Sequence, residues 1–506
     1  MVSSADSSSC SWMPISLSNR IRALFVSSEI YPIAKTGGLA DVSAALPREL
    51  SRDGDIDLIL MMPGYDSAFE VISDLRELCQ LEGLPGGSAR LLIGTMPETD
   101  LRVVILDQPQ SFRRAGGLYV DQNGIEWPDN AIRFAAFCHA AAELAMGRVM
   151  PGWRADIVHC NDWHTGLVPV LLHFQQGRRP RTIMTLHNLA FQGNYPADLL
   201  PALNLPVGAF SIEGCEYFGQ ISFLKGAIAL ADKLTTVSPS YAEEITTPEF
   251  GMGMEGVLAH RRADLHGILN GIDGTIWNPE TDPDIAQRYS ADTLAGRAAC
   301  KLAVQREWGL VPDVQAPLFV YAARIETQKM ADVLLDVMHD LMERERLQVA
   351  ILGKGARSLE LGFAGWPGRA PGRVAVRIGY NEVWAHQLLA GGDILLHGAR
   401  FEPCGLTPLY AMHYGAVPIV RAVGGLRDSV TDADETALAD GSATGFQFAA
   451  ANAVGLLDAV DRALKLYARP DLWHRLQRAG MCRDFSWRGS AARYRRIYDE
   501  LLGLPA

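Results

Sequence analysis

The clearest evidence for the fold is the stretch Asp393-Ile394-Leu395-Leu396-His397-Gly398-Ala399-Arg400-Phe401-Glu402-Pro403-Cys404-Gly405-Leu406-Thr407-Pro408-Leu409-Tyr410. Its apolar beginning predicts a short buried strand, and its end predicts a helix that stops at Gly415. In open α/β sheets, ligands bind at such strand-to-helix turns, and the unpaired N–H groups of a helix start favour an anion. Glu402 is therefore either an acidic residue at a helix N-terminus or a group that meets a ligand.

The same alternation of strand and helix recurs along the chain and predicts the fold class. Strands are expected at 22–28, 57–62, 101–106, 156–161, 181–188, 233–238, 266–273, 317–324, 347–352, 374–378, 393–397 and 417–420, with helices at 130–146, 331–344, 381–390 and 491–502. Strands that alternate with helices indicate parallel sheets with right-handed crossovers. We therefore predict an α/β protein with two Rossmann-like, doubly wound domains that face each other across a cleft.

The length and a Pro- and Asp-rich boundary suggest where the domains divide. A chain of 506 residues exceeds the ~250–300 residues of a single core. The run Pro279-Glu280-Thr281-Asp282-Pro283-Asp284 is typical of a linker. We expect a Ser-rich, disordered tail at 1–20, an N-terminal domain at 21–280, a C-terminal domain at 281–485, and a helix at 486–506 that can pack back on the N-terminal domain.

Charge and cysteine usage argue against several classes of protein. The formal net charge of −12 argues against nucleic acids and anionic membranes as partners. The chain contains no run of about 18 uncharged apolar residues, so no membrane-spanning helix is predicted. The eight cysteines form no CxxC pair, which fits reduced thiols. We expect a cytoplasmic protein; a plastid leader is also Ser-rich, but the segment Met1–Arg20 is short for one.

A glycine turn after the first predicted strand is a candidate anion site. In Lys35-Thr36-Gly37-Gly38-Leu39-Ala40-Asp41 the two glycines allow close approach of the backbone to a ligand, and Lys35 adds a charge. Gly424-Gly425-Leu426-Arg427-Asp428 repeats the Gly-Gly-Leu-x-Asp pattern, so two turns could face the same phosphates. Ordinary helix starts would give the same pattern.

Two cations beyond another predicted strand are candidate phosphate ligands. Arg324 offers a planar fork and Lys329 a point charge. A charge pair at ~4 Å is worth ~4 kcal/mol at an effective dielectric of 20, whereas a helix terminus gives ~0.3–1 kcal/mol. These cations would therefore contribute more than the helix starts to holding a diphosphate, although a surface Arg beside a helix-start Lys is also common. The histidines lack carboxylates at metal-ligand spacing, so no metal site is predicted.

The combined motifs resemble the bacterial and plastid glycogen (starch) synthases over roughly residues 21–500. The motifs that carry the resemblance are Lys35-Thr36-Gly37-Gly38-Leu39-Ala40-Asp41-Val42, Asn161-Asp162-Trp163-His164, His187-Asn188-Leu189-Ala190-Phe191-Gln192-Gly193, Phe218-Gly219-Gln220-Ile221-Ser222-Phe223-Leu224-Lys225, Asn270-Gly271-Ile272-Asp273, Glu402-Pro403-Cys404-Gly405-Leu406-Thr407 and Gly424-Gly425-Leu426. The resemblance implies a GT-B-type, metal-independent glycosyltransferase without a cofactor. It would transfer glucose from ADP-glucose, with retention of configuration, to the non-reducing end of an α-1,4-glucan such as glycogen or starch.

The resemblance also implies roles for individual residues. The implied catalytic residues are Arg324, Lys329, Glu402, His187 and Asp162. The implied substrate-binding residues are Lys35, Gly37, Gly38, Asp41, Asn270, Cys404, Gly405, Leu406, Thr407, Gly424 and Gly425.

Two departures from the family pattern and two alternatives remain open. Met330 stands where the family has a glycine, so its side chain could hinder backbone approach to phosphate, and Gly398-Ala399 stands where the family has Pro-Ser. One alternative is a transferase of the same fold with another nucleotide-sugar donor or a small acceptor. The other is a glucan-binding homologue with weak or lost catalysis.

Overall fold

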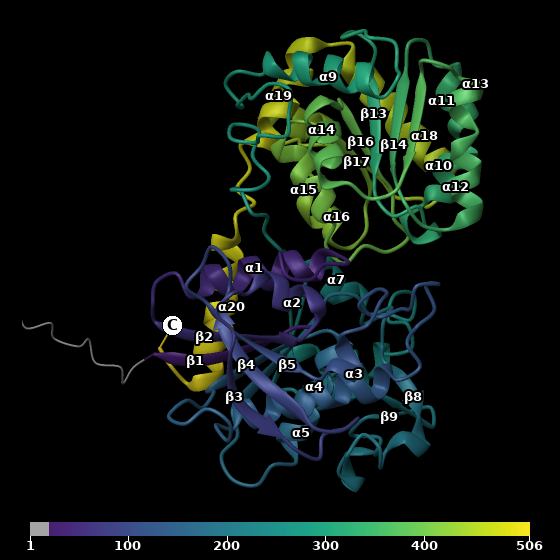
Figure 1. Cartoon of the computed structure of the whole chain (residues 1–506). Coiled ribbons are helices and arrows are strands. Elements are labelled where there is room, and N and C mark those ends of the chain that lie inside the picture. The colour runs from purple at the N-terminus through teal and green to yellow at the C-terminus, as the bar shows by residue number, and fades with distance from the viewer. Residues whose placement is uncertain (1–19, 506) are drawn as a thin grey trace, which may run out of the picture.

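Two large sheets, each flanked by helices, form the two halves of the chain (Figure 1). The computed structural model describes residues 20–505. The predicted Ser-rich tail thus falls, except for Arg20, outside the described residues. The two Rossmann-like α/β halves confirm the predicted fold class, whereas the predicted domain boundaries stay predictions. Within residues 20–505, no helix is both long and apolar enough to cross a membrane.

The N-terminal half contains a nine-stranded sheet in the order β12-β11-β7-β6-β1-β2-β5-β4-β3. Its strands are β1 (Ile21–Val26), β2 (Ile56–Pro63), β3 (Arg76–Leu81), β4 (Ala89–Thr95), β5 (Arg102–Asp107), β6 (Ile157–Asn161), β7 (Arg181–Leu186), β11 (Lys233–Thr236) and β12 (Leu265–Gly267). Its helices are α1 (Gly38–Leu50), α2 (Asp66–Val71), α3 (Pro109–Phe112), α4 (Asn130–Ala145), α5 (Leu167–His173), α6 (Phe223–Leu230), α7 (Pro239–Glu244) and α8 (Glu255–His260). The central strands are buried on both faces, which explains their continuous apolar runs.

One edge of this sheet differs from the prediction of a parallel sheet. β4 pairs antiparallel with both β3 and β5. A turn that contains Gly83, Gly86 and Gly87, all with positive φ, joins β3 to β4. A turn this short can connect only antiparallel strands, because parallel strands need a long crossover. A small antiparallel sheet of β8 (Asn194–Pro196), β10 (Gln220–Ser222) and β9 (Glu216–Tyr217) was not predicted either.

The C-terminal half contains a six-stranded, entirely parallel sheet in the order β15-β14-β13-β16-β17-β18. Its strands are β13 (Leu318–Ala322), β14 (Gln348–Gly353), β15 (Val374–Ile378), β16 (Ile394–His397), β17 (Val417–Arg421) and β18 (Phe446–Phe448). Its helices are α9 (Gly296–Glu307), α10 (Ala331–Asp336), α11 (Met338–Glu343), α12 (Arg357–Ala364), α13 (Trp366–Arg369), α14 (Glu382–Gly391), α15 (Leu406–His413), α16 (Gly424–Ser429), α17 (Glu435–Asp440), α18 (Ala453–Tyr467) and α19 (Pro470–Met481). The single helix predicted at 331–344 is two helices, because buried Val337 leaves helical geometry between them.

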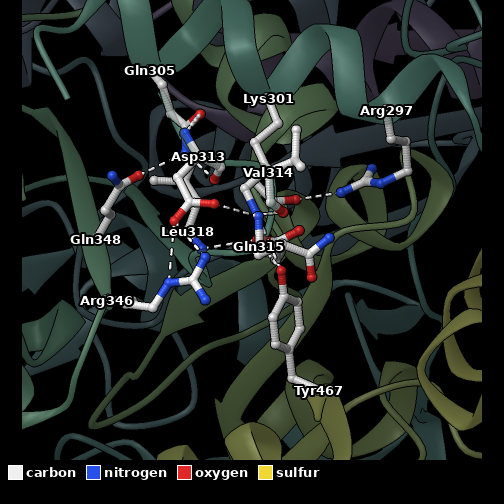
Figure 2. A network of polar contacts seen from close by, with 12 residues as sticks. Arg297, Lys301, Gln305, Asp313, Val314, Gln315, Leu318, Arg346, Gln348 and Tyr467 are labelled. Atoms are coloured by element: carbon white, nitrogen blue, oxygen red, sulfur yellow. Dashed lines mark hydrogen bonds and ion pairs between the residues drawn. The ribbon is translucent and has the colours of Figure 1, made fainter. Parts of the chain in front are cut away.

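A buried polar network fastens α9 to the start of the C-terminal sheet (Figure 2). The Lys301 ammonium donates to Asp393 Oδ2 at 2.6 Å and to the Val314 carbonyl at 2.9 Å. Asp393 Oδ2 also accepts from the Leu318 amide at 2.8 Å. The Lys301 side chain is only 4% exposed. The pair therefore joins α9 to β13 and β16 at the amino ends of these strands.

The last helix, α20 (Trp487–Leu502), returns to the N-terminal half (Figure 1). Trp487, Tyr494 and Tyr498 are buried in the N-terminal core. The Tyr498 hydroxyl lies 2.9 Å from His159 Nδ1, within the nine-stranded sheet. The chain thus crosses between the two halves twice, once before α9 and once before α20.

Candidate active site

A buried ion pair lies at the carboxyl ends of β13 and β16. Lys329 comes from a single turn of 3-10 helix, Thr327–Lys329, after β13, and Glu402 follows β16. The Lys329 ammonium donates to Glu402 Oε2, which also lies 3.2 Å from His397 Nε2. Burial alone would raise the pKa of Glu402, but Lys329 and His397 lower it to about 2. Glu402 is therefore a buried carboxylate that stays ionised at neutral pH.

Arg324 lies on the same loop but does not share this pair. It is exposed, and its guanidinium donates to Gln328 Oε1 at 3.1 Å. Within residues 20–505 it forms no ion pair with a carboxylate. Its charge is therefore available to an incoming anion, whereas that of Lys329 is already shared with Glu402.

The Met330 side chain points into the core. Met330 has a left-handed backbone (φ 52°, ψ 29°) and is 1% exposed. A Cβ added to Gly398 would lie 3.2 Å from both Cβ and Sδ of Met330. The two departures noted in the sequence therefore meet in space: Met330 fills volume beside a position that carries no side chain.

This contact predicts that residues 330 and 398 are energetically coupled. Met330→Gly is expected to lower the free energy of unfolding by about 2 kcal/mol, because the loss of a buried side chain exceeds the relief of left-handed strain. Gly398→Ala should be tolerated better in the Met330→Gly background than alone. A double-mutant cycle in urea should give a coupling of about 1 kcal/mol. Additive effects would show that the two residues do not share this space.

The Gly424-Gly425 turn packs directly on the Glu402 loop. A Cβ at Gly424 would lie 2.0 Å from the Glu402 carbonyl oxygen, and one at Gly425 would lie 2.2 Å from that of Cys404. Gly405 has φ 84° and precedes α15, which begins with Leu406 and Thr407. The glycines thus permit close packing of two loops. Burial raises the pKa of the Cys404 thiol to about 12, so the thiol is protonated at neutral pH.

The Gly424 amide already has a carboxylate partner from the other half of the chain. It donates to Glu244 Oε1 of α7 at 2.9 Å. Nearby, Asp428 accepts hydrogen bonds from the amide and hydroxyl of Ser240 at 2.8 and 2.7 Å. α7 and α16 thereby hold the two halves together where they meet (Figure 1).

The first glycine turn lies on the opposite half. Lys35 donates to Asp41 at 2.9 Å and to Glu382 of α14 at 3.4 Å, so it also bridges the two halves. Burial alone would lower the pKa of Lys35, but the Asp41 carboxylate raises it above its ordinary value. Gly37 precedes α1, and a Cβ at Gly38 would lie 3.1 Å from Leu406 Cδ1. The first turn therefore faces the start of α15.

A third group follows β6 and β7. Asp162 has φ 55°, and its Oδ1 accepts from the His187 amide at 2.7 Å. Burial raises the pKa of Asp162 to about 7 and lowers that of His187 to about 3. Asn270 is 5% exposed, and its Oδ1 is buried without a hydrogen-bond partner among residues 20–505. This oxygen can accept a hydrogen bond from a ligand hydroxyl.

Several residues of this region were not predicted from the sequence. They are Glu29, Glu244, Glu382 and His397. His397 carried a weak signal, because it is a polar residue at the end of an apolar strand. The glutamates carried none, because no sequence pattern around a glutamate indicates which donor its carboxylate will meet.

One group of potential metal ligands joins the segment that precedes α9 to helix α14. Asp282, Asp284 and His386 place ligand atoms within 4.8 Å of one another. Asp282 Oδ2 already accepts from the Tyr414 hydroxyl at 2.5 Å and lies 2.7 Å from His386 Nδ1. Asp282 and His386 are buried and Asp284 is partly exposed, and the absence of a metal site stays a prediction.

Comparison with known families divides the chain in two. The family model described as "Starch synthase catalytic domain" matches residues 22–260. The model described as "Glycosyl transferases group 1" matches residues 307–480.

Curated relatives match over almost the whole chain. The glycogen synthase of Burkholderia thailandensis is 49% identical over 481 residues, which cover 94% of this chain and 90% of that protein. The glycogen synthase of Thioalkalivibrio sulfidiphilus is 45% identical over 95% of this chain and 100% of that protein.

Solved structures share the same architecture. The catalytic domain of starch synthase IV from Arabidopsis thaliana, bound to ADP and acarbose, has a TM-score of 0.87 and 31% identity and covers 96% of this chain and 100% of that one. Sucrose-phosphate synthase from Thermosynechococcus elongatus, at a TM-score of 0.59 and 16% identity, shares the fold alone.

Proposed function

We infer the reaction from one premise: the chain belongs to the glycogen synthase family of glycosyltransferases. It is a glycosyltransferase that transfers glucose from ADP-glucose to an α-1,4-glucan. The observation that carries this conclusion is 49% identity to a glycogen synthase across 94% of the chain. We further propose that glucose is added at the non-reducing end with retention of configuration, and that the protein acts in the cytoplasm, as its bacterial relatives suggest.

We propose that the two cations on the loop after β13 bind the diphosphate of the donor. Arg324 is exposed and has no carboxylate partner in the described part of the chain. Lys329 lies five residues further along the same loop, and in the structure its ammonium is paired with Glu402. As the glycosidic bond breaks, negative charge grows on the diphosphate, and nearby cations stabilise it. These cations would take the place of a divalent ion.

Glu402 is proposed to face the glucose. It is 6% exposed and ionised, and two donors hold it in place. A fixed negative charge beside the sugar would stabilise positive charge that develops at the anomeric carbon. Cys404, Gly405, Leu406 and Thr407 continue the same loop into α15 and are proposed to contact the donor through the loop backbone.

The N-terminal half is proposed to supply the remaining contacts. Lys35, with Gly37, Gly38 and Asp41, would border the donor at the start of α1. Asp162, His187 and Asn270 would contact glucose and acceptor hydroxyls. The unpaired Oδ1 of Asn270 supports this role, because a buried polar atom without a partner is costly unless a ligand satisfies it.

An assay of donor preference tests the proposal. The protein should incorporate glucose into glycogen from ADP-glucose, with much lower turnover from UDP-glucose, and EDTA should not reduce the rate. Preference for another nucleotide sugar, or for a small acceptor, would support the alternative transferase. Binding to glycogen without turnover of any donor would instead favour a glucan-binding homologue.

A further inference from the structure

A buried carboxylate lies directly behind the Lys35–Gly38 turn. Glu29 follows β1 and is 3% exposed. Its Oε2 accepts hydrogen bonds from the amides of Thr36 at 2.6 Å and Gly37 at 3.2 Å. Its Oε1 accepts one from the Thr36 hydroxyl at 2.5 Å. Three donors from a single turn therefore converge on one carboxylate.

Glu29 is held by polar donors alone. No ion pair to Glu29 occurs within residues 20–505, and its fourth donor is the Tyr119 hydroxyl at 2.7 Å. A carboxylate can be buried without a cation only if hydrogen bonds replace its hydration. The hydrogen bonds from the turn therefore replace the hydration of the Glu29 carboxylate. The same hydrogen bonds fix the backbone of the turn.

These contacts decide which groups of the turn can meet a ligand. The amides of Thr36 and Gly37, which a phosphate would otherwise use, are occupied by Glu29. A Cβ added to Gly37 would meet no atom within 4 Å, so the opposite side of the turn is open. The first N–H groups of α1, which have no partners within the helix, are left for the ligand, and Lys35 lies beside them, paired with Asp41 and Glu382.

Glu29 also connects this turn to the sugar side of the cleft. Tyr119 donates to Glu29 Oε1, and its ring stacks on His164 with centroids 4.3 Å apart. His164 belongs to the segment that contains Asp162. A shift of Glu29 would therefore displace groups on both sides of the proposed donor site.

We propose that Glu29 is a positioning residue for donor binding. It fixes the Lys35–Gly38 turn and closes the Thr36 and Gly37 amides to phosphate, so the donor meets Lys35 and the start of α1. This inference rests on the proposed function, because it assigns the turn to ADP-glucose.

Glu29→Gln tests the proposal with little change in volume. An amide NH₂ cannot accept a hydrogen bond, so at least one set of contacts with the turn is lost. The KM for ADP-glucose is expected to rise about tenfold, while the KM for glycogen stays within about twofold. Asp74→Asn is the matched control: Asp74 accepts from the amide and hydroxyl of Thr95 at 2.8 and 2.7 Å, on the antiparallel edge of the same sheet.

The outcomes separate a positioning role from a structural one. An unchanged KM for ADP-glucose, or equal rises in both KM values together with a lower Tm than that of Asp74→Asn, would overturn the proposal. If Glu29→Gln does not fold, Thr36→Val removes only the hydroxyl contact, and the KM for ADP-glucose should rise about threefold; no rise would overturn the proposal. Wild-type protein inactive with ADP-glucose would instead refute the proposed function.

Discussion

Lys329→Ala is expected to lower kcat by about 100- to 1000-fold, the usual effect of losing one preorganised charge that acts on the transition state. The effect should fall on kcat more than on the KM for glycogen, because charge on the leaving diphosphate grows only as the bond breaks. Steady-state kinetics with ADP-glucose and glycogen measure it. Lys465→Ala, which changes an exposed lysine of α18, is the control and should behave as wild type.

The ion pair with Glu402 adds a second effect that can be separated. Without Lys329, the buried Glu402 side chain keeps only His397 as a partner among residues 20–505, so the pKa of Glu402 should rise. The double variant Lys329→Ala/Glu402→Gln removes this unpaired charge. If it recovers the stability lost in Lys329→Ala, that loss comes from the unpaired carboxylate; turnover is compared only between Lys329→Ala and wild type, because Glu402 is itself proposed to act on the sugar. A Lys329→Ala enzyme with kcat within twofold of wild type would contradict the proposed role.

Lys301→Ala is expected to destabilise the C-terminal half by about 3–5 kcal/mol, because it leaves the Asp393 carboxylate buried without its cation. The side chains of Lys301 and Asp393 are 4% and 12% exposed, so water cannot replace the lost partner. Thermal or urea unfolding followed by tryptophan fluorescence measures the change.

Neutralising both partners provides the control for this pair. Lys301→Met/Asp393→Asn removes both charges but keeps an acceptor for the Leu318 amide, so it should recover much of the lost stability. Arg346→Ala, which breaks an exposed ion pair with Asp313 in the same region, should cost less than about 1 kcal/mol. If Lys301→Ala and Arg346→Ala lower the free energy of unfolding equally, the buried pair contributes no more to stability than the exposed one.

Much of the fold could be predicted because it depends on local patterns. The strand 374–378 and the helix 130–146 follow directly from their runs of apolar residues, and the structure has them at Val374–Ile378 and Asn130–Ala145. The β3–β4 hairpin was not predicted, because the edge strand β3 is largely exposed and has no continuous apolar run, and the buried run of β4 is short. The break at Val337 was also missed, since tertiary packing overrode a continuous helical pattern.

The candidate site was predictable only where a motif is continuous in sequence. The loop of Glu402 to Thr407 and the turn of Lys35 to Asp41 could be selected from their own residues. The acids Glu29 and Glu244, which occupy amides of the two glycine turns, could not, because nothing in the sequence around a carboxylate indicates which donor it will meet. The direction of the Met330 side chain likewise depends on the empty position at Gly398.

The return of α20 to the N-terminal core has a consequence for how the chain folds during synthesis. The ribosome releases the N-terminal half first, yet Trp487, Tyr494 and Tyr498 of its core are among the last residues made. The nine-stranded sheet must therefore wait, with part of its apolar face uncovered, until the C-terminal half has been synthesised. The N-terminal half expressed alone, without residues 487–502, should aggregate or bind chaperones, whereas adding this helix as a separate peptide should improve its solubility.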